Sequence, residues 1–261
     1  MPITIPERLG DFATAVALGT VRNTNGNPYV NVERFMHRES VSTTEEGLWN
    51  GPGDFFQPTA GHRVRIRAGG DAADAGNGAG ARTVLVSGTD TTGAIVTDVL
   101  TTQGAAASDL SNVEFFRVNE IKVLTVGTYG GGNVGAVSLE TQAGNLWLTI
   151  DILENVSHHG HIAIPTSHTA VLLGVMMHIE SGKAVDFTIW ARPNGYDVTG
   201  DDYSPAFVIR TFAQVDAGLY TIPFVNPRVL TPGADFWATA KTIASTSAAS
   251  LLFEYRLVPA S

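Results

Sequence analysis

Hydrophobic and polar positions alternate along much of this chain with the period of a β-strand. The clearest case is residues 62–68, HRVRIRA, in which valine, isoleucine and alanine alternate with three arginines. Because a strand points successive side chains to opposite faces, this segment predicts a strand with one buried and one solvated face. The arginines then need no ligand to account for them.

Further short runs bounded by Gly, Asp, Asn or Thr predict strands along the rest of the chain. The gaps between them are short, which favours antiparallel hairpins. Long amphipathic helices do not alternate with these runs, so a parallel α/β sheet is not expected. A first group of strands is expected at 83–87, 95–100, 115–125 and 136–141, and a second begins near Leu146 and continues at 163–164, 170–179, 185–191, 206–212, 218–222, 235–240 and 251–258.

These patterns predict an all-β fold of two antiparallel β-sandwich domains, the second jelly-roll-like, preceded by an extended N-terminal arm. The arm is expected at 1–60, where turn formers outnumber apolar runs, with a short helix predicted at 9–21. The domains are expected at 61–144 and 145–261. Apolar positions of the first group are expected to face its core: Val64, Ile66, Val84, Val86, Val99, Val118, Ile121 and Val123.

Composition narrows the function classes. Only 16% of residues are charged while 44% are hydrophobic, so Gly, Thr, Ser and Asn must supply much of the polar surface, which favours strands over surface helices. The net charge is −9 with scattered Lys and Arg, which argues against nucleic-acid binding. The absence of cysteine excludes disulfides and thiolate chemistry. No apolar stretch approaches the ~20 residues of a membrane span, so we do not expect the protein to associate with a membrane. We expect it to be synthesised in the host cytoplasm and to be located in the virion.

Five short motifs occur in a characteristic order. They are EEGLWNGPGDFFQP at 45–58, DAADAGNGAGARTVLVSGTD at 71–90, TDVLTTQG at 97–104, FFRVNEIKVL at 115–124 and IPTSHTAVLLG at 164–174. In order and spacing this series resembles a family of structural proteins of tailed bacteriophages, many of them marine. The resemblance implies a place in the virion, as a capsid decoration or cement subunit, a neck protein or a tail-fibre protein.

The densest group of potential metal ligands is a histidine cluster, comprising His158, His159, His161 and His168. In an extended strand His159 and His161 share a face, which can hold zinc or nickel. Neither a cysteine nor a His-Glu-x-x-His pattern accompanies them, so we favour a role in a surface loop or in packing between subunits. No cofactor or bound metal is expected.

Acidic loops and a Gly-rich run are the other candidates for ligand chemistry. Neither acidic group has the spacing of an EF-hand, and both are interpreted as solvated turns: Asp71, Asp74 and Asn77 in one, Asp197, Asp201 and Asp202 in the other. The glycines at 76, 78 and 80 lack the Gly-Lys-Ser/Thr of a phosphate loop. No Gly-x-Ser-x-Gly elbow occurs, and we expect no enzymatic activity.

Aromatic residues in the predicted arm lie among turn formers that offer no core of their own. We therefore predict that they contact other subunits: Tyr29, Phe35, Trp49, Phe55 and Phe56. Packing against the chain's own sandwich is the alternative for Trp49, Phe55 and Phe56. Trp147, Trp190 and Trp237 lie in predicted strands and are interpreted as core, although an exposed tryptophan would also suit a sugar platform.

The sequence thus predicts a virion structural protein that acts through contacts with other virion proteins and assembles as a homo-oligomer, with a trimer as the expected form. The alternative function, from a different class, is a carbohydrate-recognition module that contacts the host cell surface.

Overall fold

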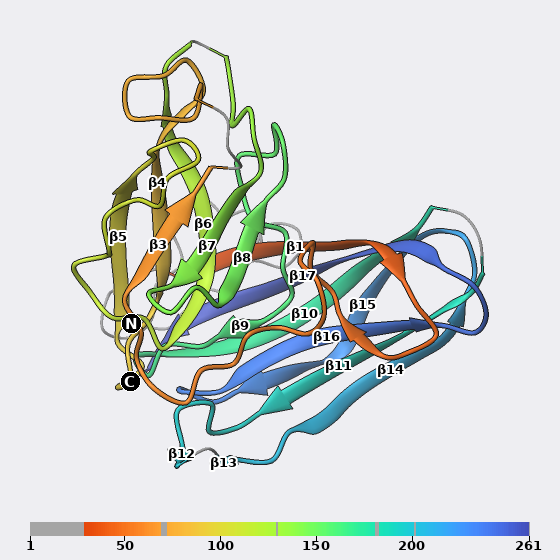
Figure 1. Ribbon diagram of the computed structural model, residues 1–261. Helices are drawn as coiled ribbons and strands as arrows, with labels where there is room; N and C mark the ends of the chain where they lie inside the picture. Colours follow the sequence, from red (N-terminus) through yellow and green to blue (C-terminus); the bar gives the residue numbers. More distant parts are fainter. Residues whose placement is uncertain (1–28, 69–71, 129, 181–182, 201, 261) are drawn as a thin grey trace, which may run out of the picture.

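The computed structural model describes residues 29–68, 72–128, 130–180, 183–200 and 202–260. All regular structure within these residues is β, as predicted, and every strand pairing is antiparallel. None of these residues forms a helix long and apolar enough to cross a membrane. The helix expected at 9–21 lies outside the described residues. Figure 1 shows two β-units, a larger one built around β10, β11, β16 and β17 and a smaller one built from β3 to β8.

The larger unit is a sandwich of two sheets. One sheet has the order β1-β17-β10-β15, and the other has the order β14-β11-β16-β2, with β9 also paired to β16. Its strands are β1 (Val30–Val41), β2 (Glu46–Gly47), β9 (Ile162–Ala163), β10 (His168–Ile179), β11 (Val185–Arg192), β14 (Phe207–Val215), β15 (Gly218–Leu230), β16 (Asp235–Thr242) and β17 (Ser247–Pro259). A small hairpin of β12 (Val198–Thr199) and β13 (Asp202–Tyr203) follows β11.

The strand order of the larger unit is that of a jelly roll. Following the chain, with β2 and β9 counted as one strand position, each strand lies in the opposite sheet from the one before it, except that β11 and β14 share a sheet. The first and last strands, β1 and β17, are neighbours. This arrangement of two Greek keys in eight strands defines the jelly roll. The predicted jelly-roll-like sandwich is therefore present, but it recruits its first strands from a part of the chain that we expected to form an arm.

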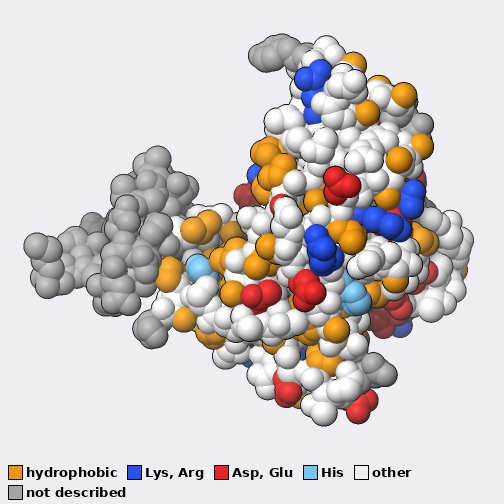
Figure 2. Space-filling view, turned by 60° about the vertical axis from the view of Figure 1, so that its left-hand side comes forward, with side chains coloured by type: hydrophobic (Ala, Val, Ile, Leu, Met, Phe, Trp, Pro, Cys, Tyr) orange, Lys and Arg blue, Asp and Glu red, His pale blue; other side chains and the backbone are white. Residues whose placement is uncertain are grey.

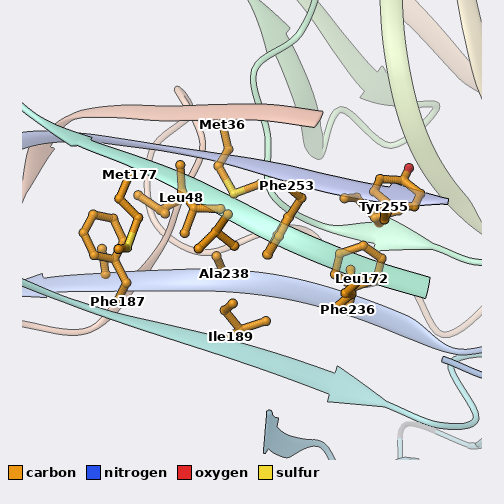
Figure 3. Packing of buried hydrophobic residues seen from close by; sticks show 14 of the residues in the cluster. Met36, Leu48, Leu172, Met177, Phe187, Ile189, Phe236, Ala238, Phe253 and Tyr255 are labelled. Atoms are coloured by element: carbon orange, nitrogen blue, oxygen red, sulfur yellow. The ribbon is translucent and has the colours of Figure 1, made fainter. Parts of the chain in front are cut away.

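Side chains from both sheets fill the space between them (Figure 3). Met36 of β1 and Leu48 meet Met177 of β10 and Phe187 of β11, while Phe253 of β17 lies edge-on to Phe236 of β16, with ring centroids 5.1 Å apart. Alternate residues of each strand supply these groups, because the pleat sends every second side chain inward.

The smaller unit is also a sandwich, of two three-stranded sheets with the orders β3-β7-β8 and β5-β4-β6. Its core takes apolar side chains from both sheets, including Val64, Val86 and Leu148. Its strands are β3 (Val64–Arg67), β4 (Ala81–Thr89), β5 (Ile95–Thr101), β6 (Arg117–Val126), β7 (Val137–Thr141) and β8 (Leu146–Ile150).

Two of the expected boundaries differ from the structure. Residues 30–41 form β1 and pair with β17, so the described part of the predicted arm belongs to the jelly roll. Residues 146–150 form β8, which pairs with β7 and adds Trp147 and Leu148 to the core of the smaller unit, so this unit continues beyond the junction expected at 144 and 145. The pairing partners decide both cases, and they are not visible in a local pattern.

The smaller unit is inserted into one strand position of the jelly roll. β2 pairs with Thr239 and Ala240 of β16, and β9 pairs with Asp235 and Phe236 of the same strand, in the same direction. β2 and β9 therefore lie end to end along one edge of β16. The chain leaves the jelly roll after β2, forms the smaller unit, and rejoins the jelly roll at β9. Both ends of the insertion are held by the same sheet.

The predicted inward positions of the smaller unit are largely confirmed. Of the eight residues, six are buried and Val123 is partly buried against the core. The prediction for Val99 is wrong, since Val99 is 46% exposed while its neighbour Leu100 is buried. Leu100 pairs with the inward Val84, and paired residues share a face, so β5 presents Leu100 and not Val99 to the core.

Candidate functional site

Most of the aromatic residues that we expected at an interface pack within the chain. Trp49 is only 2% exposed, and its indole Nε1 donates to the carbonyl oxygen of Gly53 at 2.9 Å. Phe55 lies between Trp49 and His161, with centroid distances of 6.1 and 5.9 Å. Phe56 packs edge-on against Trp147 of the smaller core at 5.2 Å. The premise that these three rings lack a core within the chain is wrong.

The two remaining aromatic residues of that prediction lie at the surface. Phe35 of β1 is 38% exposed on the outer face of its sheet and packs edge-on against His158, with centroids 4.8 Å apart. Tyr29 precedes β1 and is partly exposed. A contact of Phe35 and Tyr29 with another subunit stays a prediction.

The histidine cluster does not form a single group. His159 and His161 are buried, contrary to the expected surface loop, whereas His168 is partly exposed and contacts the Ser167 hydroxyl. His158 lies 3.7 Å from Glu154 through Nε2 and Oε2. Among the described residues, no three His, Cys, Asp or Glu side chains are placed to hold a metal ion.

The buried His161 belongs to an ionic cluster at the seam between the two units. Its Nε2 donates to Oδ2 of the fully buried Asp235 at 3.1 Å. The same oxygen lies 3.2 Å from Nη1 of Arg192 and 3.5 Å from Nε of Arg117. Arg117 comes from β6 of the smaller unit, whereas Asp235 and Arg192 come from the jelly roll. One carboxylate therefore joins cations from both units.

Electrostatics at this seam keep the carboxylate ionised and the histidines neutral. Burial raises the pKa of Asp235, but the hydrogen bond from His161 and the charges of Arg192 and Arg117 outweigh burial, so its pKa is lowered. Burial lowers the pKa of His161 despite the opposing pull of Asp235. Burial also lowers the pKa of His159 well below its ordinary value, helped by the charge of Arg34.

Further hydrogen bonds join the two units along β4 and β6. The side chain of Asn119 forms a reciprocal pair with the backbone of Ala163, donating from Nδ2 at 2.9 Å and accepting at Oδ1 at 2.8 Å. Arg34 of β1 pairs with Glu120 at 2.5 Å. Tyr196 donates to the hydroxyl of Thr89 at 2.7 Å. These contacts add to the Asp235 cluster in joining the two units.

The acidic loops have structural uses. Asp74 is buried, and its carboxylate accepts backbone N–H groups of Ala81, Val134 and Gly135, so its oxygens serve the loop and not an ion. Asp197 is exposed and accepts from the Ser204 hydroxyl at 3.2 Å, as expected of a solvated turn. Asp71 and Asp201 lie outside the described residues.

A group of exposed apolar side chains lies on two edge strands. β14 and β15 end their respective sheets on the same side of the jelly roll, joined by the turn at 216–217. Exposed apolar side chains line both strands, and we call them the edge surface: Phe207, Val208, Leu219, Val225 and Val229. Val225 is 92% exposed.

β15 is built to expose this edge without pairing along its whole length. Its register with β10 passes from Arg228 to Pro223, so residues 224–227 bulge out of the ladder and carry Val225 at the surface. Proline lacks the N–H that a further strand would need, so Pro223 and Pro227 hinder strand addition. The prolines in GLYTIPFVNPRVL are the sequence signal that marks an edge strand, and our strand prediction did not use it.

On the face shown in Figure 2, acidic and basic side chains are few and scattered among uncharged ones. The exposed residues Arg210, Asp216 and Arg228 give the edge strands charges of both signs. Neither sign dominates this edge.

Comparison with known proteins found no matching family and no matching curated protein. Solved structures include weak neighbours. One is the infectious bursal disease virus Gt strain structure, with 9% identity and a TM-score of 0.27 over 89% of this chain and 72% of that chain. Another is a Bacillus thuringiensis Cry1Da tryptic core variant, with 8% identity and a TM-score of 0.20 over 96% of this chain and 54% of that chain. A third is the VP2 subviral particle of infectious bursal disease virus, with 8% identity and a TM-score of 0.18 over 88% of this chain and 75% of that chain.

Proposed function

We propose that this chain is a structural subunit of a tailed-phage virion, either a capsid decoration or cement subunit or a neck or tail appendage. It acts by burying surface against copies of itself and other virion proteins and has no enzymatic activity of its own. The observation that carries the proposal is the edge surface of the jelly roll. The ordered motifs that resemble phage structural proteins support the same class.

The edge surface fits a contact with a second copy of this chain. Apolar groups exposed along two adjacent strands are a feature of association sites on soluble proteins. Because Pro223 and Pro227 hinder strand addition, the contact is formed by side-chain packing around Val225 and Leu219. The charges of both signs on these strands allow each copy to pair basic groups with acidic groups of its neighbour.

The seam between the units supports this role. A subunit whose role is to present a fixed shape to its neighbours must hold its two sandwiches in a fixed position relative to each other. The buried Arg117–Asp235 contact joins the two sandwiches and supports this requirement. The jelly roll is a fold of viral capsid and lectin domains, which is support at the level of fold analogy alone. By the same analogy to small phage appendages, we propose a trimer as the assembled state.

The test is the oligomeric state and location of the chain. Size-exclusion chromatography with light scattering should show a concentration-dependent oligomer, and mass spectrometry should find the chain in purified virions of the virus that encodes it. Val225→Asp places a charge in the contact without disturbing the core, and should weaken self-association by about tenfold or more. Ile95→Asp is the matched control, since Ile95 is 57% exposed on the smaller unit.

A monomer at every accessible concentration, together with absence from purified virions, would overturn the proposal. Equal loss of association in the Ile95 and Val225 variants would place the contact elsewhere and remove the edge surface as its basis.

A further inference from the structure

A pocket of about 380 Å³ lies on the outer face of the sheet that contains β11 and β16. Its floor and walls include Glu45, Asp54, Phe55, Gln57, Trp190 and Trp237. The volume lies within the range of small-molecule sites. None of the buried seam cations lines it, and the edge surface lies outside it.

Two tryptophans form its aromatic side. Trp190 of β11 and Trp237 of β16 are cross-strand partners, and their rings are stacked with an interplanar angle of 13° and centroids 6.5 Å apart. Val185, Phe187 and Ile189 point into the core, so strand alternation sends Trp190 to the opposite, outer face. Trp237 is buried while Trp190 is partly exposed, so the accessible indole is that of Trp190.

Hydrogen bonds hold this indole in place. Nε1 of Trp190 donates to Oγ1 of Thr239 at 3.0 Å and to Oε1 of Glu45 at 3.2 Å. The Glu45 carboxylate thereby stands at the edge of the ring, with Oε2 unbonded within the described part of the chain. Such a fixed ring costs little further ordering when a ligand stacks on it.

The opposite wall depends on a glycine. A Cβ at Gly47 would lie 2.5 Å from Cε2 of Phe55, so only glycine lets this ring close on the sheet beside Thr239. Asp54 accepts the N–H of Gly47 at 3.3 Å through Oδ1. Gln57 accepts from Nη2 of Arg192 at 3.0 Å through Oε1, which turns its amide nitrogen into the available donor.

This combination matches the chemistry of a sugar ring. A pyranose has an apolar C–H face that packs on an indole, and adjacent hydroxyls that donate to carboxylates and accept from an amide. Two carboxylates and no Lys or Arg line the pocket, which disfavours an anionic sugar. The Arg192 guanidinium lies 5.2 Å from the Trp237 ring centroid, so that ring already has a cation partner and Trp190 is the ring left for a ligand.

We propose that this pocket binds one pyranose residue of a neutral glycan, stacked on Trp190, with hydroxyl groups donating to Glu45 and Asp54. This goes beyond the structural role proposed above and does not depend on it. A subunit carrying such a pocket in many copies would contact a glycan surface multivalently, so a weak single site is sufficient.

Saturation-transfer NMR and calorimetric titration of the full chain test the site. The probes are the methyl glycosides of glucose, galactose, mannose and N-acetylglucosamine, with glucuronic acid and tetramethylammonium as charged comparisons. At least one neutral glycoside should bind, with saturation strongest on the protons of one ring face, and both charged probes should bind more weakly.

Variants assign the binding to the pocket. Trp190→Ala should weaken it by about tenfold or more, and Trp190→Phe should retain part of it. Glu45→Gln keeps an acceptor for the indole and should weaken binding less than Trp190→Ala. Leu124→Ala is the control, since Leu124 is an exposed apolar residue that lies outside both the pocket and the edge surface, and this variant should leave binding unchanged. Circular dichroism checks that each variant is folded.

Three results would overturn the proposal. They are no binding of any neutral glycoside, unchanged binding in the folded Trp190→Ala protein, and preferential binding of tetramethylammonium, which would make the pocket a cation site.

Discussion

Replacement of Asp235 by Asn tests the seam between the two units. Asn has nearly the same shape but no charge, so it leaves the guanidiniums of Arg117 and Arg192 buried without a counterion. Their side chains are 1% and 7% exposed, so water cannot replace the carboxylate. Breaking a buried ion pair from one side costs about 3 to 5 kcal/mol. We expect the free energy of unfolding to fall by about 3 kcal/mol or more.

The structure argues for the lower part of this range. Arg117 keeps its hydrogen bonds to the carbonyl oxygens of Pro58, Phe116 and Gly195, at 3.1, 2.9 and 2.7 Å. These backbone acceptors continue to compensate part of its desolvation when the carboxylate is neutralised. Arg117→Met removes these donors too, so it should also destabilise the protein although Asp235 keeps Arg192 and His161.

The assay is urea unfolding followed by tryptophan fluorescence and circular dichroism at pH 7. Glu140→Gln is the matched control, because its partners Arg65 and Arg67 are 26% and 44% exposed, and such pairs contribute about 1 kcal/mol or less. If Asp235→Asn costs no more than this control, the buried carboxylate does not hold the seam and the reasoning from burial fails.

Two further predictions concern core register and pH. Leu100→Ala should lower the free energy of unfolding by about 2 kcal/mol or more, and Val99→Ala by less than about 0.5 kcal/mol, as read from urea midpoints; the reverse order would contradict the register of β5. The pKa values of His159 and His161 are lowered in the folded chain, so below about pH 6.5 the unfolded chain binds protons that the folded chain does not. The free energy of unfolding should therefore fall as the pH falls, by up to about 1.4 kcal/mol per pH unit for each histidine. Asp235, whose pKa is lowered in the folded chain, adds a further loss of stability below pH 3.8, the ordinary pKa of an aspartate. Urea unfolding curves at pH 7, 6 and 5 measure this dependence of stability on pH. His159→Leu should make the dependence weaker. Equal stability at pH 7 and pH 5 would contradict the prediction.

The candidate site was only partly predictable. The sequence singled out Trp190 and left open whether it lies in the core or on a sugar platform, and strand alternation with its neighbours resolves this in favour of the outer face. Phe55 was expected at a subunit interface and instead forms a wall of the same pocket. Its place depends on Gly47, which is brought beside Thr239 by the pairing of β2 with β16. No local pattern shows that pairing.

The sequence by itself determined most of the strands that follow residue 62, because alternation within a few residues records which side chains are buried. The expected strand at 185–191 corresponds to β11, and that at 170–179 corresponds to β10. The tertiary structure alone decided how these strands were shared between units. Val30 pairs with Leu257 and joins β1 to the jelly roll, while Trp147 turns to the smaller core. Likewise His161 pairs with Asp235, on which Arg117 and Arg192 also converge from distant strands. Alternation of apolar and polar residues shows which face of a strand is buried. The strand that packs on or pairs with it can come from the opposite end of the chain, so a local pattern does not identify it.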